Sequence, residues 1–298
     1  IVDKNKTWKN FVCSRPAQRM ACSLSAIIHS HHQLSNGALK SSYRHLLEQP
    51  DLVDQLIILT DEQWQDLQQE GFPATQMAVI PNHLDNGNIP ANPQKVPSQT
   101  VIYLARYSEE KQHALLLSAF RKVLAVIPDA QLHTYGVGPL RRSLSAQVAE
   151  WGLAQAIHIN GFTSDIAQAH KTACCTVLCS TQEGQSISAV EAMAYGTPLI
   201  SFAIKYGPRD ILQDRQAGML VPCGDEEALA AALIKVIADK TLQQSMRQAA
   251  LRNAQRYYAS AIAERWAAWL QASERLMAAQ AKADIGLASK SPQAASVG

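Results

Sequence analysis

Short apolar, β-branched runs alternate with longer amphipathic segments along most of the chain. This alternation is typical of a parallel sheet with helices on both faces. In the first third it predicts strands at 25–29, 55–60 and 77–80 and helices at 38–48 and 61–70. Thr60 stands just before Asp61, where strand gives way to helix, and its hydroxyl can cap that helix. The pattern therefore predicts an α/β fold.

The second region of the chain repeats the alternation more completely. Strands are expected at 101–104, 131–135, 157–159, 176–180, 198–202 and 219–221, and helices at 113–126, 140–151, 165–172, 188–195, 209–213 and 226–238. Such a set makes a full doubly wound domain, whereas the first third offers only about half of the strands that such a domain uses. We therefore expect two Rossmann-like, doubly wound domains, the N-terminal one incomplete because the chain begins inside a larger protein.

Shifts in composition divide the chain further. From 81 to 98, Asn, Pro and Gly dominate, and these residues can neither continue a helix nor fill a central strand. Within the helical stretch 241–278, the stripe of Trp266, Trp269 and Leu270 is expected to pack back onto the first domain. The predicted division is 1–84 for the first domain, 85–100 for a linker, 101–253 for the second domain, 254–278 for a C-terminal helix and 279–298 for a flexible tail.

Composition and charge exclude several classes of function. The 27 Lys+Arg and 25 Asp+Glu leave a formal net charge of +2, which argues against a nucleic-acid partner bound by phosphate neutralisation. No apolar run approaches the roughly 18 residues of a membrane helix. The 6 cysteines show no repeated Cys-x-x-Cys pairing, which favours a reducing compartment, and Cys174, Cys175 and Cys179 are expected to pack as small hydrophobes. We expect a cytoplasmic protein that could work at the inner face of the membrane.

The strongest local motif is EGQSISAVEAMAYG, which begins at Glu183 and carries a second carboxylate, Glu191. Gly184 allows close backbone approach, and Ser186 or Ser188 can cap the predicted helix. Amides at the start of that helix would then face an anion, as in a phosphate cradle at the carboxyl end of a strand. The alternative is a capped surface helix with an incidental pair of glutamates.

Two cations follow the first strand of the second domain, in LARYSEEKQH. Arg106 and Lys111 could neutralise a diphosphate, the arginine through its bidentate fork and the lysine as a point charge. The alternative is a solvated charged loop, since Glu109 and Glu110 stand between them. A glycine turn, YGVGP at 135–139, is as compatible with a tight turn as with a ligand loop.

Together these segments resemble the donor half of the retaining, two-domain nucleotide-sugar glycosyltransferases of the glycogen-synthase-like class, family 4, which have the GT-B fold. The resemblance covers about residues 20–275. It is carried by Arg106 with Lys111, YGVGP, NGF at 160–162, the two glutamates and AMAYGTPLIS. KYGPRDIL at 205–212 and HSHH at 29–32 resemble the bacterial branch that contains teichoic-acid α-glycosyltransferases and the glycosyltransferases of serine-rich adhesins.

The resemblance implies a UDP-sugar-dependent retaining hexosyltransferase with no cofactor and no metal, acting on a cell-wall polymer or protein acceptor with glucose or N-acetylglucosamine. It implies that Arg106 and Lys111 hold the pyrophosphate, Glu191 the ribose and Glu183 the hydroxyls of the donor sugar. Further implied donor contacts are Gly138, Phe162, Gly184, Ser186, Ile187 and Ser188. The departure at 185–188 from the glycine and aromatic residues of many relatives leaves the choice of donor sugar open.

The resemblance also implies a catalytic set of Glu183, Arg106, Lys111 and a histidine that faces the donor sugar from the first domain. Among His29, His31 and His32 we favour His32, and the alternative is that all three are solvated residues at a strand end.

Two other functions remain as alternatives. A non-catalytic, glycosyltransferase-like adaptor subunit would be expected to lose the donor-site charges, which this chain keeps. A sugar-nucleotide epimerase of the same architecture would not be expected to carry YGPRDIL. Besides the UDP-sugar and the acceptor, we expect self-association or a partner chain to cover the incomplete first domain, because its missing strands would leave a sheet edge exposed.

Overall fold

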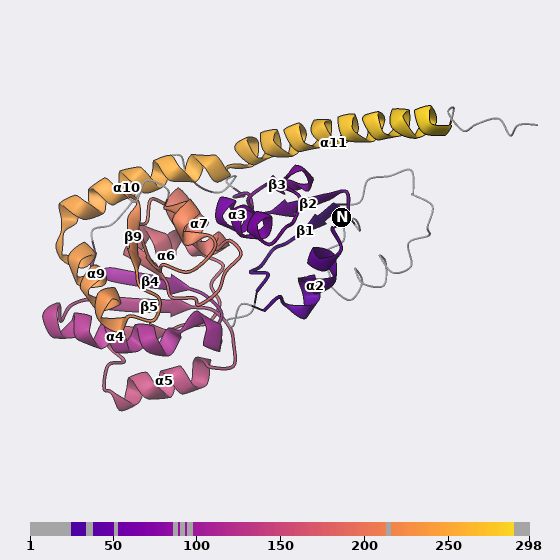
Figure 1. Ribbon diagram of the computed structural model, residues 1–298. Coiled ribbons are helices and arrows are strands. Elements are labelled where there is room, and N and C mark those ends of the chain that lie inside the picture. The colour runs from indigo at the N-terminus through magenta and orange to yellow at the C-terminus, as the bar shows by residue number, and fades with distance from the viewer. Residues whose placement is uncertain are drawn as a thin grey trace, which may run out of the picture.

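The computed structural model describes residues 25–33, 38–50, 53–85, 89, 93, 98–212 and 216–288. These residues form two lobes, each built on a parallel sheet, with a long C-terminal helix that runs from the second lobe along the first (Figure 1). The architecture is the α/β class that the alternating pattern predicts. Among the described residues, no helix has both the length and the apolar character needed to cross a membrane.

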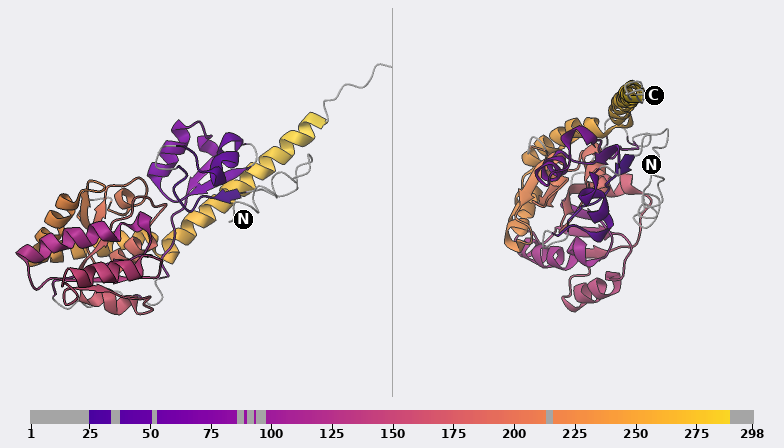
Figure 2. Two further views of the ribbon diagram at one scale, coloured as in Figure 1. Left: turned by 90° about the horizontal axis from the view of Figure 1, so that it is seen from below. Right: turned by 45° about the vertical axis from the view of Figure 1, so that its right-hand side comes forward.

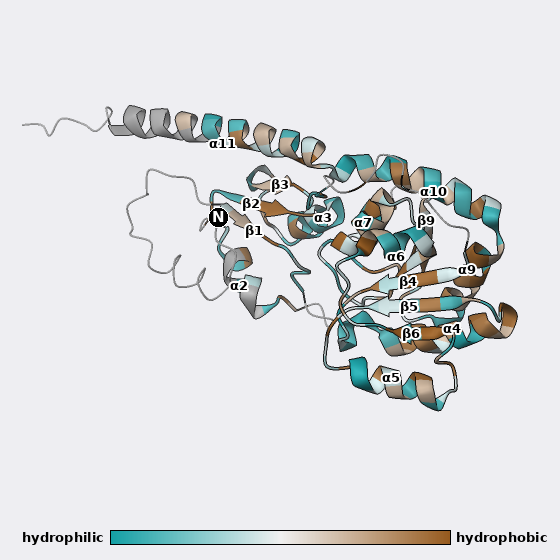
Figure 3. Cartoon of the chain, turned by 180° about the vertical axis from the view of Figure 1, so that it is seen from behind, coloured by the Kyte–Doolittle hydropathy of each residue, from teal (hydrophilic) through white to brown (hydrophobic). Residues whose placement is uncertain are grey.

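The first lobe holds a three-stranded sheet of order β1-β2-β3, all parallel. Its strands are β1 (Ser25–Ile27), β2 (Gln55–Ile58) and β3 (Met77–Val79), and its helices are α2 (Ser41–Glu48), α3 (Asp61–Gln69) and the short 3-10 turn η2 (Ala74–Gln76). Strand β2 is buried along its whole length and appears brown in Figure 3. The predicted cap is confirmed, because the Thr60 hydroxyl accepts a hydrogen bond from the Gln63 amide at 3.2 Å.

The second lobe holds a six-stranded parallel sheet of order β6-β5-β4-β7-β8-β9. Its strands are β4 (Thr100–Leu104), β5 (Gln131–Tyr135), β6 (Ile157–Ile159), β7 (Ala173–Leu178), β8 (Leu199–Phe202) and β9 (Gly218–Val221). This is the doubly wound order, in which the first strand of each half, β4 and β7, lie side by side. In sheets of this order, ligands commonly bind at the carboxyl ends of these two strands.

Helices cover both faces of this sheet. They are η4 (Glu109–Lys111), α4 (His113–Val126), α5 (Arg141–Glu150), α6 (Ile166–Thr172), α7 (Ile187–Ala194), α8 (Pro208–Ile211) and α9 (Glu226–Ala238). Side chains of β4 alternate between the faces: Val101 joins the core cluster that includes Phe120 of α4, whereas Ile102 packs with Ala169 of α6. Cys174, Cys175 and Cys179 are buried in or beside β7, which confirms their packing role.

The C-terminal helices differ from the expected single helix at 241–278. Helix α10 (Lys240–Ala254) and the 3-10 turn η5 (Gln255–Tyr257) precede a second helix, α11 (Ala259–Ala288). The break coincides with a contact to the segment between the lobes, since the Leu84 amide donates to the Tyr257 carbonyl at 2.7 Å. Helix α11 also extends through 279–288, part of the expected tail, and positions 289–298 lie outside the described residues.

Helix α11 lies alongside the strands of the first lobe and projects beyond them (Figures 1 and 2). Trp266 and Trp269 pack against Ile57 and Ile80, and the Ser273 hydroxyl donates to the Gln55 side chain at 2.8 Å. Leu270, the third residue of the expected stripe, is 52% exposed and turned away from this contact. The indoles are therefore the part of the stripe that holds the helix against the first lobe.

Candidate active site

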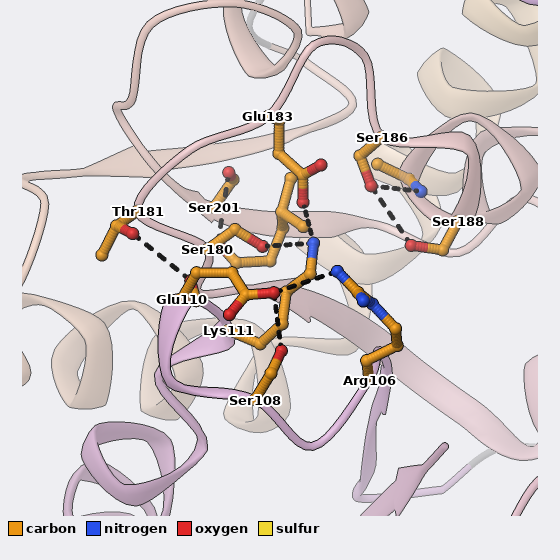
Figure 4. Close-up of polar contacts among 12 residues, drawn as sticks. Arg106, Ser108, Glu110, Lys111, Ser180, Thr181, Glu183, Ser186, Ser188 and Ser201 are labelled. Atoms are coloured by element: carbon orange, nitrogen blue, oxygen red, sulfur yellow. Dashed lines mark hydrogen bonds and ion pairs between the residues drawn. The ribbon is translucent and has the colours of Figure 1, made fainter. Parts of the chain in front are cut away.

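The loops after β4 and β7 bring the predicted lysine and the first glutamate together (Figure 4). The Lys111 ammonium lies 2.6 Å from a Glu183 carboxylate oxygen and donates to the Ser180 hydroxyl at 3.2 Å. The two charged side chains are only 15% and 13% exposed. A cation held in this way at the doubly wound crevice is placed to meet an anionic ligand.

The backbone around Lys111 is held by both neighbouring strands. The Tyr103 hydroxyl, buried on β4, donates to the Lys111 carbonyl at 2.9 Å. The Thr181 amide, just after β7, donates to the Glu110 carbonyl at 2.9 Å. The loop that carries Lys111 is therefore tied to the loop that carries Glu183, and the pair is fixed by the sheet itself.

The structure places Arg106 in the same region but outside the ion pair. Its side chain is 72% exposed, and its guanidinium donates to the Glu110 carboxylate at 3.0 Å. Glu110 also accepts a hydrogen bond from the Ser108 hydroxyl at 2.7 Å, and this bond, with smaller contributions from Arg106 and Lys111, lowers the pKa of Glu110. Arg106 can thus swing toward a ligand at the cost of one exposed ion pair, which contributes little to stability.

The N-terminus of α7 forms the third side of the site. The Ser186 hydroxyl accepts from the Ala189 amide at 3.4 Å and lies 3.2 Å from the Ser188 hydroxyl. Capping of α7 by Ser186 confirms that expectation. The amides of the first turn have no acceptor inside the helix and carry the positive end of its dipole. Glu191 lies farther along the same helix, where burial raises its pKa, and Ile187 is 51% exposed.

Apolar side chains stand exposed at the carboxyl ends of β5 and β6. Phe162, which follows β6, is 76% exposed, and Val137, which follows β5, is 58% exposed. Gly138 lies between β5 and α5, with its backbone packed against the Tyr107 carbonyl. An exposed aromatic ring at the same sheet edge as a lysine offers a flat surface for a planar ring.

The three histidines at the end of β1 lie in different environments. His32 is fully buried, with its Nε2 atom 3.3 Å from the Glu70 carboxylate and its ring stacked on Tyr206, and burial lowers its pKa. His31 is also buried, which lowers its pKa to about 4. His29 is exposed, and its carbonyl lies so close to Gly184 that a Cβ there would be only 2.4 Å from the oxygen. The His29 backbone thus lies against the loop that carries Glu183.

Sequence reasoning missed the contacts that hold this loop from the first lobe. The Asn82 amide, in the expected linker, donates to the Gln185 side chain at 2.7 Å. Tyr206 follows β8 and reaches Asp66 of α3 with its hydroxyl at 2.6 Å. KYGPRDIL marked this segment only as a family resemblance, and no local pattern shows which surface its tyrosine meets. Within the described part of the chain, no three His, Cys, Asp or Glu side chains gather to hold a metal ion.

The sequence is similar to one family profile and to several characterised proteins. The profile of "Glycosyl transferases group 1" matches residues 87–253. The chain is 30% identical over 74% of its length to an exopolysaccharide phosphotransferase of Streptomyces coelicolor, of which it covers 24%. It is 26% identical over 81% of its length to a poly(glycerol-phosphate) alpha-glucosyltransferase of Bacillus subtilis, of which it covers 36%. It is 25% identical over 80% of its length to a poly(ribitol-phosphate) alpha-N-acetylglucosaminyltransferase of Staphylococcus aureus, of which it covers 49%.

Solved structures share the fold over a comparable span. The crystal structure of TarM superimposes with a TM-score of 0.79 at 23% identity, over 89% of this chain and 53% of that one. The pneumococcal O-GlcNAc transferase GtfA, crystallised with UDP and GlcNAc, gives 0.74 at 23% identity, over 85% of this chain and 53% of that one. A GtfA/B complex superimposes with a TM-score of 0.72 at 27% identity, over 84% of this chain and 52% of that one. The chain has the GT-B fold, spans about half or less of these relatives, and belongs to the group 1 glycosyltransferase family.

Proposed function

We propose that this chain forms the donor site of a UDP-sugar-dependent, retaining hexosyltransferase that moves glucose or N-acetylglucosamine to a cell-wall polymer or protein acceptor. The observation that carries the proposal is the largely buried Lys111–Glu183 pair at the carboxyl ends of β4 and β7, beside the N-terminus of α7. The relatives named as glucosyl- and N-acetylglucosaminyltransferases support the choice of sugar. Because the chain covers 36% and 49% of those two proteins, we propose donor binding for this chain and transfer for the whole protein.

In this proposal, Lys111 stabilises the UDP leaving group. An ammonium has three N–H donors, and Glu183 and Ser180 take two of them, so a third can point to a phosphate oxygen. Arg106 can add a bidentate contact to the same diphosphate. Both cations and the dipole of α7 would stabilise the negative charge that develops on UDP as the glycosidic bond breaks. The acceptor hydroxyl would attack the same face of the sugar, which retains the anomeric configuration.

The remaining residues complete the donor site in this proposal. Glu183 accepts hydrogen bonds from sugar hydroxyls and Glu191 from the ribose. The exposed ring of Phe162 packs on the uracil, with the backbone at Gly138 beside it. Amides of the 186–188 turn bind phosphate, and His29, rather than the buried His32, approaches the sugar from the first lobe.

The test is calorimetry of the purified chain with UDP, UDP-glucose and UDP-N-acetylglucosamine, with GDP as the matched control. We expect UDP to bind more tightly than GDP and one UDP-sugar to bind more tightly than the other. Absence of UDP binding would overturn the proposal. A non-catalytic adaptor would need no donor, so release of free sugar from the preferred UDP-sugar would argue for the enzyme over the adaptor.

A further inference from the structure

The loop that follows β8 docks onto helix α3 of the first lobe through three polar contacts. The Lys205 ammonium lies 2.7 Å from an Asp66 carboxylate oxygen, and the Tyr206 hydroxyl donates to the same oxygen at 2.6 Å. The Tyr206 amide donates to the Glu62 carboxylate at 3.0 Å. Backbone and side chain of one residue are thus held by two carboxylates on one helix.

Tyr206 itself is buried and conformationally constrained. It is 0% exposed, and its ring centroid lies 4.5 Å from that of His31 and 5.6 Å from that of His32. Its φ angle of 62° is uncommon for a bulky residue and persists only where surrounding contacts hold it in place. Burial and the Asp66 carboxylate both raise the pKa of the Tyr206 hydroxyl, so it remains a donor at neutral pH. Burial opposes the shift at Asp66, but the hydrogen bonds from Lys205 and Tyr206 lower its pKa, so the acceptor is a carboxylate.

The loop that follows β8 also contacts the loop that carries Glu183. Gly207 has a φ of 98°, and a Cβ there would lie 3.4 Å from the Gln185 Cα atom and 3.6 Å from the Ser186 nitrogen. The short chain from Tyr206 to Gly207 therefore supports the backbone from Gly184 to Ser186, directly after Glu183 and directly before α7. Two residues from the first domain also contact this segment: the His29 carbonyl lies against Gly184, and the Asn82 amide donates to the Gln185 side chain.

We propose that Tyr206 is a positioning residue for the donor site, which holds the 184–186 backbone, and with it the start of α7, against the first lobe through its hydroxyl bond to Asp66. The effect on UDP binding rests on the proposed function, whereas the support of the 184–186 backbone by Tyr206 does not depend on any ligand. Tyr206 is not catalytic in this proposal, because its polar contacts are with the first lobe rather than with Lys111 or Glu183.

The first test is amide hydrogen exchange of the ligand-free chain. Tyr206→Phe keeps the ring between the histidines and removes only the hydroxyl, and Asp66→Asn weakens the same bond from the other side. We expect exchange of amides 184–189 to become about tenfold faster in both variants, as for loss of a hydrogen bond to a charged group, with β4 to β6 unchanged. Ser273→Ala is the control, because it also removes one hydroxyl, which donates to the Gln55 side chain at 2.8 Å where α11 meets the first lobe. Unchanged exchange at 184–189, or equal acceleration throughout both lobes, would overturn the proposal.

The second test uses UDP and uridine as probes in calorimetry. We expect the dissociation constant of UDP to rise about tenfold in Tyr206→Phe and that of uridine to stay the same, because only UDP reaches the start of α7. The double variant should bind UDP no more weakly than Asp66→Asn alone, because Asp66→Asn already disrupts the Tyr206 bond together with the Lys205 ion pair. Additive losses would overturn the pairing. If the unaltered chain fails to bind UDP, the proposed function fails, whereas the exchange experiment still decides the role of Tyr206.

Discussion

Replacement of Lys111 by Ala should weaken UDP far more than uridine. The ammonium already sits in a largely buried ion pair, 2.6 Å from Glu183, so its side chain is held near the place where a diphosphate would lie. A hydrogen bond from a charged donor contributes about 1.5–3 kcal/mol, which corresponds to roughly a 10- to 150-fold rise in the dissociation constant of UDP. Uridine has no phosphate, so its binding should change by less than about threefold.

The loss of Lys111 also leaves Glu183 without its cation, and repulsion between that carboxylate and the diphosphate could mimic the loss of a direct contact. Glu183→Gln removes the negative charge, so Lys111→Ala should be compared in both backgrounds by calorimetry. A direct contact predicts that most of the loss of UDP affinity persists when position 183 is glutamine. Lys122→Ala is the matched control, because that ammonium pairs with Glu226 at 2.8 Å on the α4–α9 surface. Equal losses for UDP and uridine, or full recovery in the Gln background, would refute the assignment.

Three further predictions concern stability, and each can be measured by urea unfolding. Among the described residues, neither ring nitrogen of the buried His113 has a hydrogen-bond partner, and burial lowers its pKa to about 4. His113→Leu should therefore stabilise the chain by about 1–3 kcal/mol at pH 7. It should also remove part of the stability loss that occurs as pH falls from 6.5 toward 4. Burial raises the pKa of Asp210 to about 6, so its buried charge destabilises the folded state at pH 7 and is neutralised as pH falls toward 4. Asp210→Asn should therefore be more stable than the parent at pH 7 but not at pH 4. Trp269→Ala should cost about 3 kcal/mol because the indole packs on the first lobe, whereas Leu270→Ala should be nearly neutral; equal effects of the last pair would contradict the described packing.

The second lobe could be predicted closely from the sequence because its signals are local. Helices α4 and α9 and strands β5 and β6 begin and end where the hydrophobic periodicity places them. Helix α9 is capped by Asp225, whose carboxylate accepts from the Ala228 amide at 2.9 Å, so its start is specified within a few residues of sequence. The meeting of Lys111 with Glu183 follows from the same logic, since parallel strands deliver their carboxyl ends to one edge of the sheet.

The break between α10 and α11 could not be predicted in this way. The stretch 255–258 contains neither Pro nor Gly, and its residues are compatible with a continuous helix. The helix ends there because the chain bonds to Leu84 of the segment between the lobes, a contact between positions far apart in sequence. Local propensity is a weak determinant where such a tertiary contact competes with it.

His32 shows the same limit at the site itself. A histidine at the end of an apolar run can face solvent, a ligand or another lobe, and the run alone does not distinguish these environments. Its burial depends on Tyr206, from beyond β8, and on Glu70, from the end of α3. The environment of His32 is therefore set by residues far away in sequence, which the local pattern cannot show.

The proposed donor site is consequently not a property of the second lobe alone. Lys111, Ser180 and Glu183 are fixed by β4 and β7, but the backbone from Gly184 to Ser186 is held by Asn82, by His29 and, through Gly207, by Tyr206 on Asp66. The start of α7, which would receive the phosphates, follows directly on that backbone. Any change in the angle between the lobes must alter these contacts before it alters the strands, because packed sheets resist deformation more than loops do. In the proposed donor site, the first lobe therefore contributes to donor binding through these contacts.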